Sequence, residues 1–312
     1  MTHFSHLNRL KSKFFEHIPG QLVIQITDKC NATCPQCSMR ITQKFKRRSL
    51  EKDEVLKNIQ AAKKKNIKAI SFTGGEPFLC FDDLCEYIRY AGQMGIPFIR
   101  TGTNAFFLKN STKPGFEDKI GKWAGQLAAT PVRNFWISLD SSVPEVHEKM
   151  RGFDDVCNGI RKALPIFENE GIYPSVNLGI NRNLGGDPTY DLHPEDFGSE
   201  KAYLDSVYAV YKDAFSKFYE TVIDMGFTIA NACYPMSVES SSTDLNPVYQ
   251  ASATDRVIRF SGNEKASVFK ALQDTIPQYR DKIRIFSPLT SLYALVKTYK
   301  KGQADEGYPC LG

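Results

Sequence analysis

The chain has 312 residues, of which 42% are apolar and 24% are charged, and its net charge is +5. These proportions are ordinary for a globular protein that buries one large core. The positive charge is small for this length, so nucleic acid is not expected as a partner. No apolar run is long enough to span a bilayer, so no membrane partner is expected either. Eight cysteines without a secretory signal segment predict a protein of the reducing cytoplasm.

The chain is predicted to begin with a helical extension, Met1 to Pro19, followed by a main domain over residues 20–300 and a tail over 301–312. The extension is basic, and its apolar residues fall on one side of a helix, where they are expected to cover one end of the main domain. A first strand follows. Leu22 to Ile26 is rich in apolar and β-branched residues and is bounded by Gly20 and Asp28.

Three cysteines come directly after this strand. Cys30, Cys34 and Cys37 lie within eight residues, and a short irregular loop lets several thiolates converge on one centre. Iron–sulfur clusters are held by Cys thiolates, normally four of them. Only three are local here, so one iron without a further protein ligand would keep an open position for a small molecule. The stretch therefore predicts a reactive iron–sulfur site.

Zinc binding, disulfide bonding and simple packing suit these cysteines less well. Zinc needs four ligands in a closed site, of which Cys34 and Cys37 could supply one pair. A disulfide framework is disfavoured, because the chain has no secretory signal and is too long to depend on disulfides. Cysteines needed only for packing would not be expected to cluster in one loop. A zinc site is therefore the main alternative to an iron–sulfur cluster.

The spacing Cys30-x3-Cys34-x2-Cys37 after a first strand resembles the signature of the radical S-adenosylmethionine (radical SAM) enzymes. The resemblance implies that the three cysteines hold a [4Fe-4S] cluster and that the methionine amino and carboxylate groups of SAM bind the fourth iron. A second strand leads into Gly74, Gly75, Glu76 and Pro77, which resemble the family's segment for the SAM amino group. Glycines let a backbone approach a ligand closely, and Glu76 offers an acceptor to an ammonium.

Strands and helices alternate along the rest of the chain, which predicts βα units and a parallel sheet of the α/β class. The pattern gives six or seven strands, and the resemblance implies a partial (β/α)6 TIM-like barrel with outer helices. Chemistry in such barrels sits at the C-terminal ends of the strands, where both motifs lie. After the first strand, strands are expected at 67–73, 97–103, 132–139, 175–180, 227–233 and 283–286. Helices are expected from a cap at Ser49 to about Lys65, and near 82–94, 116–128, 153–170, 199–225 and 264–272.

Two later strand ends carry amides. The third strand ends in Thr103 and Asn104, which is similar to a Thr-Asn-Gly segment of the family's peptide-modifying and cofactor-building branches, although Ala105 replaces the glycine. The resemblance therefore places Asn104 among the residues that bind SAM. The fifth strand supplies Asn177, whose amide suits hydrogen bonding to a ribose or an adenine edge.

The fourth strand end carries the second strong match to these branches. Ser138 and Asp140 end the strand, and His147 and Arg151 follow, as in the family's Ser-Leu-Asp, His and Arg-Gly run. The resemblance implies that Ser138 contacts the SAM ribose, that Arg151 pairs with the SAM carboxylate and that Asp140 belongs to the same site. The alternative is that Asp140 caps a loop and that His147 is a surface histidine.

The sequence departs from the family at Gln36, just before the third cysteine. That position is often aromatic in the family and packs on the adenine, so stacking must come from another residue. Two polar loops, 184–198 and 235–252, are expected to set substrate specificity, because loops of this length are usually functional or disordered. The basic run up to Arg48 is either a solvated loop or a lip over an anionic substrate or acidic peptide.

The resemblance implies an oxidoreductase that cleaves SAM reductively to a 5′-deoxyadenosyl radical and abstracts hydrogen from a peptide or small-molecule substrate. A low-potential electron donor such as flavodoxin or ferredoxin is implied as a partner. One alternative is a cofactor or lipid-precursor biosynthetic member of the family, and another is a non-catalytic iron–sulfur or zinc binding module. Near the end, Cys310 is expected to be either a tail residue or the truncated start of an auxiliary-cluster extension.

Overall fold

The computed structural model describes residues 20–37, 46–233 and 256–301. The chain divides into two compact units. The first comprises Met1–Lys29, Arg47–Gly102 and Gln126–Asn134. The second comprises Cys30–Lys46, Thr103–Gly125 and Phe135–Gly312. The predicted N-terminal extension, the polar loop at 235–252, most of the basic run and Cys310 lie outside the described residues.

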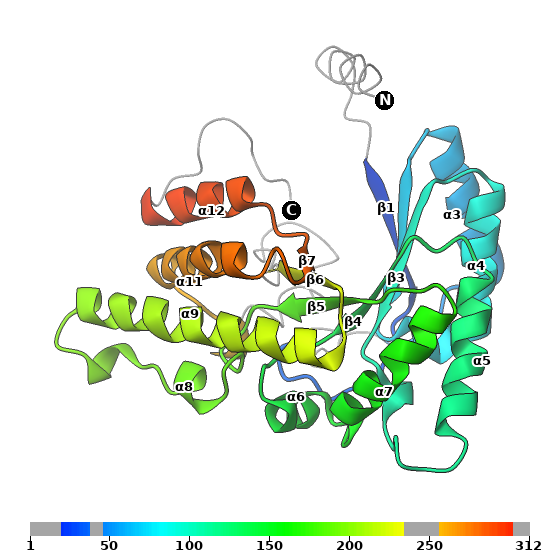
Figure 1. Cartoon of the computed structure of the whole chain (residues 1–312). Helices are drawn as coiled ribbons and strands as arrows, with labels where there is room; N and C mark the ends of the chain where they lie inside the picture. The colour runs from blue at the N-terminus through cyan, green and yellow to red at the C-terminus, as the bar shows by residue number, and fades with distance from the viewer. Residues whose placement is uncertain (1–19, 38–45, 234–255, 302–312) are drawn as a thin grey trace. The chain divides into compact units, whose positions relative to one another are not determined.

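Parallel strands form the sheet of the first unit in the order β1, β2, β3 (Figure 1). The strands are β1 (Gln21–Thr27), β2 (Ala69–Gly74) and β3 (Phe98–Thr103), and the helices between them are α3 (Lys52–Lys64) and α4 (Phe81–Gln93). Successive side chains of a strand point to opposite faces, and one face here packs on the helices. Phe72 of β2, for example, meets Tyr87 of α4 with 6.3 Å between ring centroids.

The sequence predicts that helix α3 begins after a cap at Ser49, but in the structure the helix begins after Glu51. The N–H of Glu51 donates to Glu54 Oε2 at 3.2 Å in a capping box. Ser49 instead forms an antiparallel bridge with Thr27 at the end of β1, and its hydroxyl donates to Thr27 Oγ1 at 2.9 Å. The predicted cap is therefore wrong, because Ser49 is paired with Thr27 at the end of β1 and does not cap the helix.

The sheet of the second unit is also parallel, in the order β4, β5, β6, β7. Its strands are β4 (Asn134–Ser138), β5 (Ser175–Gly179), β6 (Ile229–Cys233) and β7 (Arg284–Ile285). Phe135 of β4 packs on Phe167 of α7 (Val156–Asn169), with 5.4 Å between ring centroids. Every strand thus pairs with the next one along the chain inside its unit, as repeated βα units require. The predicted α/β class is confirmed, with a seventh strand of two residues.

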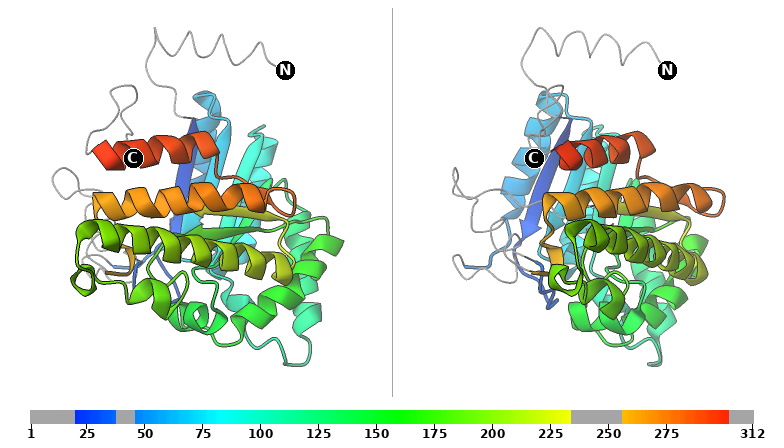
Figure 2. Two further views of the ribbon diagram at one scale, coloured as in Figure 1. Left: turned by 60° about the vertical axis from the view of Figure 1, so that its left-hand side comes forward. Right: turned by 90° about the vertical axis from the view of Figure 1, so that its left-hand side faces the viewer.

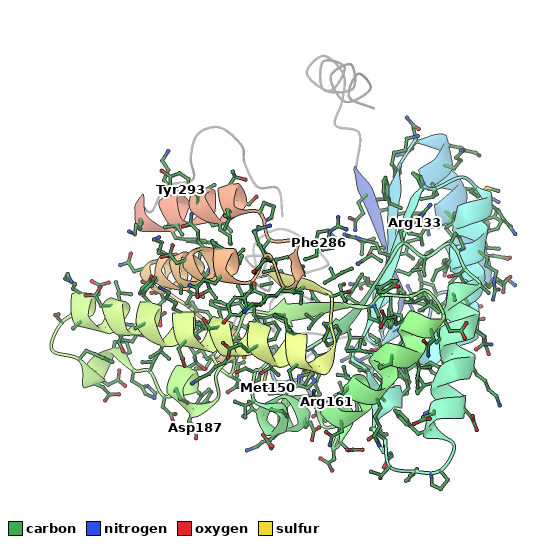
Figure 3. The ribbon with its side chains drawn as sticks, in the orientation of Figure 1. Arg133, Met150, Arg161, Asp187, Phe286 and Tyr293 are labelled. Atoms are coloured by element: carbon green, nitrogen blue, oxygen red, sulfur yellow. The ribbon has the colours of Figure 1, made fainter. Side chains whose placement is uncertain are left out.

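Three helices of the second unit, α9 (Glu200–Met225), α11 (Gly262–Thr275) and α12 (Leu289–Lys301), lie side by side in all three views (Figures 1 and 2). Ser199 caps α9 by accepting the N–H of Ala202 at 3.2 Å, and Gly226 ends the helix with φ 103°. The aromatic residues that α9 carries are largely buried. Tyr293 lies on the outer side of α12 and is 63% exposed (Figure 3).

A buried ion pair fixes α11 to the segment after β5. Arg182 Nη2 donates to Glu264 Oε1 at 2.6 Å, and the Tyr203 hydroxyl of α9 donates to the same oxygen. Val257 and Ile258 precede α11 in the chain. They pack on Met150 of the short helix α6 (Pro144–Arg151; Figure 3). These contacts hold residues 257–264 against α6, α9 and the segment after β5.

Shorter elements complete the fold. They are the helices α5 (Phe116–Ala128) and α8 (Asp187–Tyr190). They also include the 3-10 helices Pro77–Cys80 (η1), Phe106–Leu108 (η2), Pro194–Asp196 (η3), Arg256–Ile258 (η4) and Ile276–Gln278 (η5). The sequence predicts α5 with these bounds but misses α6, α8 and α12. Among the helices of the described chain, none combines the length and the apolarity that a bilayer crossing requires.

Candidate active site

Backbone hydrogen bonds fix the end of β1 immediately before the first cysteine. The N–H of Gly75 donates to the carbonyl oxygen of Thr27 at 2.7 Å, and the N–H of Glu76 donates to that of Lys29 at 2.9 Å. Lys29 directly precedes the cysteine loop, which we define as residues 30–37. The end of β2 therefore holds Thr27 and Lys29, the last residues of the first unit before the cysteine loop.

Both glycines of the second motif are required by this close approach of two backbones. A Cβ atom on Gly75 would lie 2.2 Å from the carbonyl oxygen of Lys29, and one on Gly74 would lie 2.3 Å from that of Thr27. Gly74 also has φ 153°, which side chains rarely allow. The sequence predicts glycines that approach a ligand, whereas the contacts in this structure are with the backbone at the end of β1.

Glu76 has a structural partner of its own. Its side chain is 1% exposed, and Oε1 accepts the N–H of Phe78 at 3.0 Å as the N-cap of η1. The cap holds the carboxylate in one orientation at the C-terminal end of β2. The predicted contact between Glu76 and the SAM amino group stays a prediction.

The cysteine loop is anchored inside the second unit by the end of α6. The N–H of Thr33 donates to the carbonyl oxygen of Arg151 at 2.9 Å. Gly152 follows with φ 74°, and a Cβ atom there would lie 2.5 Å from Thr33 Oγ1. Glycine is thus needed where the helix end meets the loop.

The three thiols have different surroundings. Cys30 is exposed, Cys37 is half-buried and Cys34 is buried. Cys34 and Cys37 are joined by a turn in which the N–H of Cys37 donates to the carbonyl oxygen of Cys34 at 3.3 Å, and Pro35 stands at the second position, which turns favour. Burial raises the pKa of the Cys34 thiol to about 12, while the nearby Arg151 cation acts in the opposite direction.

The donor set of the cysteine loop fits an iron–sulfur cluster. It offers three thiols and no other ligand type, and two N–H groups approach Cys30 Sγ, from Ala32 at 3.5 Å and from Asn104 Nδ2 at 3.6 Å. Such donors suit a thiolate, which is the form that binds iron. Within residues 20–37, 46–233 and 256–301, no three His, Cys, Asp or Glu side chains are gathered closely enough to share a metal ion. The three thiols of the cysteine loop are therefore close in sequence but do not form a preformed metal site in the part of the chain that the structure describes.

Asp140 and Arg151 form a buried bidentate ion pair. Arg151 donates from Nε to Asp140 Oδ2 at 2.7 Å and from Nη2 to Oδ1 at 3.0 Å. The carbonyl oxygen of Asp140 also accepts Asn181 Nδ2 at 2.7 Å. The sequence brings Asp140 and Arg151 to one site but does not pair them. A SAM carboxylate at Arg151 would therefore have to use the guanidinium N–H groups that Asp140 leaves, on Nη1 and on the outer side of Nη2.

His147 completes this cluster and is not a surface residue. Its ring is fully buried, and Nδ1 accepts the N–H of Asp140 at 3.1 Å, so the proton of the neutral ring is on Nε2. Burial lowers the pKa of His147 to about 4, with Asp140 acting against this shift and Arg151 with it. Nε2 has no hydrogen-bond partner among the described residues. The alternative of a surface histidine beside a loop-capping Asp140 is wrong.

A row of neutral polar side chains crosses β4, β5 and β6. Parallel register sets Ser138 beside Asn177 and Asn177 beside Asn231, and Asn231 Nδ2 donates to Asn177 Oδ1 at 2.9 Å. Cys233 Sγ lies 3.8 Å from the same oxygen. Sequence reasoning finds Ser138 and Asn177 but misses Asn231 and Cys233, which counting alternate residues along the predicted sixth strand could have found.

Residues 24–178 match the family described as the Radical SAM superfamily. The chain belongs to this superfamily, whose members are enzymes that use a [4Fe-4S] cluster and SAM. The predicted family and cofactors are confirmed, and the alternative of a non-catalytic binding module is excluded.

Curated relatives share sequence with part of the chain. A "Probable GTP 3′,8-cyclase" of Methanocaldococcus jannaschii is 31% identical over 160 residues, which are 50% of this chain and 49% of the relative. A protein of the same description from Saccharolobus solfataricus is 30% identical over 197 residues, 57% of this chain and 58% of the relative. The chain thus spans about half the length of the curated relatives it matches.

Solved structures show the same fold over nearly the whole chain. SuiB of Streptococcus suis bound to S-adenosylmethionine has a TM-score of 0.59 at 14% identity, covering 93% of this chain and 56% of that one. Native anSMEcpe with bound AdoMet has a TM-score of 0.52 at 15% identity, covering 91% and 67%. These likenesses establish the partial-barrel fold and do not by themselves identify a substrate.

Proposed function

We propose that Cys30, Cys34 and Cys37 hold a [4Fe-4S] cluster and that the chain uses SAM bound there to start radical chemistry on a substrate. The observation that carries the proposal is the cysteine loop itself, which contributes three thiols directly after β1. Backbone bonds from β2 hold Thr27 and Lys29, which precede the loop, and a bond from Thr33 to the end of α6 holds its middle. When bound, the cluster and SAM supply a radical that abstracts hydrogen.

We assign the SAM amino group to Gly74, Gly75 and Glu76. The capped carboxylate of Glu76 is held in place before a ligand arrives, which lowers the cost of binding an ammonium. Ser138 and Asn177 are proposed to bind the SAM ribose or adenine, because they stand next to each other in the parallel register of β4 and β5. The charges of Arg151 and Asp140 act on the Cys34 thiol, which supports including this pair in the proposed site.

The substrate is proposed to be a peptide or a small metabolite. The row formed by Ser138, Asn177 and Asn231 offers hydroxyl and amide groups and no charge, which suits the amides of a peptide or the hydroxyls of a metabolite. Cofactor biosynthesis on a nucleotide is the second candidate, favoured by the identity of about 30% with the probable GTP 3′,8-cyclases. GTP and short peptides can be compared for the increase in 5′-deoxyadenosine formation that each causes.

Anaerobic reconstitution tests the cluster. We expect a brown protein with about four iron and four sulfide per chain, in keeping with one cubane cluster. Cys34→Ser should hold far less iron, because one ligand is lost. Cys85→Ala is the matched control, since Cys85 is a buried thiol on α4 outside the cysteine loop. Tight binding of one zinc with no iron would contradict the proposal.

A further inference from the structure

The side-chain amide of Asn104 is held in a fixed orientation between β3 and η2. Its Oδ1 accepts the N–H of Phe106 at 3.0 Å, a local turn that asparagine favours. Only the oxygen of a side-chain amide can accept a backbone N–H, so this bond identifies which end of the amide is Oδ1 and which is Nδ2. Asn104 is 5% exposed, and the neighbouring Ala105 has φ 66° and donates its N–H to Thr103 Oγ1 at 3.0 Å. The loop is therefore built around this one orientation.

The donor end of the amide points at the cysteine loop. Asn104 Nδ2 lies 3.6 Å from Cys30 Sγ and 3.1 Å from Asn31 Oδ1. An amide nitrogen carries two hydrogens, so it can serve both acceptors at once. The N–H of Ala32 adds a second donor to the same sulfur at 3.5 Å. Cys30 is exposed, so these donors face the thiol that is least shielded from water in the cysteine loop.

We propose that Asn104 is a positioning residue that donates an N–H···S hydrogen bond to the Cys30 thiolate and thereby raises the reduction potential of the cluster. The inference rests on the proposed role of Cys30 as a ligand. Hydrogen bonds to the sulfurs are among the features that set the potential of an iron–sulfur cluster. Reduction adds negative charge to the cluster and its sulfurs, so a donor stabilises the reduced form more than the oxidised form. This role differs from the SAM contact that the family resemblance assigns to Asn104.

Three substitutions separate the donor from the charge and from the turn. Asn104→Asp keeps an oxygen for the N–H of Phe106, removes the donor and adds one negative charge. Asn104→Ser also keeps a turn-forming oxygen but adds no charge. Asn31→Asp adds the same charge beside Cys30, while Asn104 keeps its donor and an acceptor for its second hydrogen.

The measurement is a redox titration of the reconstituted protein followed by electron paramagnetic resonance. At the wild-type midpoint, we expect Asn104→Ser to hold roughly tenfold less reduced relative to oxidised cluster, which is about 59 mV for a one-electron couple. Asn104→Asp should shift further in the same direction and by more than Asn31→Asp. An unchanged midpoint in Asn104→Ser, or equal shifts in the two aspartate variants, would overturn the proposal.

Iron analysis keeps this test apart from that of the proposed function. A wild-type protein without iron would show that the proposed function itself has failed. If the wild type and Asn31→Asp load fully while both Asn104 variants hold no cluster, Asn104 serves only to fold the cysteine loop, and the tuning role is wrong. Loading in all four proteins with the expected order of midpoints supports it.

Discussion

The carboxylate of Glu76 caps η1 through the N–H of Phe78, and the family resemblance also gives it the SAM amino group. Two substitutions tell these roles apart. Glu76→Gln keeps an oxygen for the cap but loses the charge, so the dissociation constant of SAM should rise about tenfold or more, as expected for a hydrogen bond to a charged group. The free energy of unfolding should hardly change, whereas Glu76→Ala should lower it by about 1 kcal/mol.

Both quantities can be measured on the reconstituted protein, SAM binding by equilibrium dialysis and unfolding by denaturant titration. Iron content serves as the internal control, because Glu76 is proposed to meet the ligand and not the iron. A SAM dissociation constant unchanged in Glu76→Gln would remove Glu76 from the SAM site and leave it only the cap.

Single residues show where reasoning from sequence ends. The three cysteines could be predicted as ligands because their spacing is local and their chemistry is specific. Asp140, His147 and Arg151 could be placed in one motif, but their partners could not be assigned, since spacing does not report burial. The bidentate pair and the buried ring of His147 depend on packing between β4 and α6 that only the fold supplies.

At the scale of elements, the packing of β2 on the end of β1 depends on the absence of a side chain at Gly75. Gly75→Ala would place Cβ 2.2 Å from the carbonyl oxygen of Lys29, so Lys29, which precedes the cysteine loop, must move. We expect the free energy of unfolding to fall by about 1–3 kcal/mol, as for other overpacked sites, and iron content to fall with it. Denaturant titration and iron analysis measure the two effects.

Gly121→Ala is the matched control for that substitution. Gly121 lies within α5, and a Cβ atom there would meet nothing within 4 Å. Alanine should therefore stabilise the protein by about 0.4–1 kcal/mol and leave iron content unchanged. If Gly75→Ala behaves like Gly121→Ala, the close approach of β2 to β1 is not needed to position the cysteine loop.

The strands and the long helices could be predicted because apolar periodicity is strong in buried elements. The sequence misses α6, which has eight residues and ends at a glycine in the left-handed region. It also misses α12, although Pro288 precedes that helix and Leu292 and Val296 are buried with helical spacing. The helical spacing of α12 is therefore readable in the sequence. The choice of Glu51 over Ser49 as the cap of α3, in contrast, depends on the bridge between Ser49 and Thr27.

At the scale of the whole molecule, the family match by sequence covers a shorter part of the chain than the structural likeness does. The family match ends at residue 178, while the structural likeness to SuiB covers 93% of the chain. Motif residues cluster at the early strand ends, so sequence carries the identification there. Beyond β5 only the alternation of strands and helices continues the pattern, and the structure shows that β6 adds Asn231 and Cys233 to the row of Ser138 and Asn177.

Cleavage of SAM at a cluster held by Cys30, Cys34 and Cys37 is the central proposal for this protein. The most direct test is to incubate the anaerobically reconstituted, reduced protein with SAM and to quantify 5′-deoxyadenosine and methionine by liquid chromatography and mass spectrometry. We expect both products in equal amounts, formed slowly even without substrate, and neither from Cys34→Ser. A protein that carries the full cluster, binds SAM and is fully reduced, yet forms no 5′-deoxyadenosine, would contradict the claim.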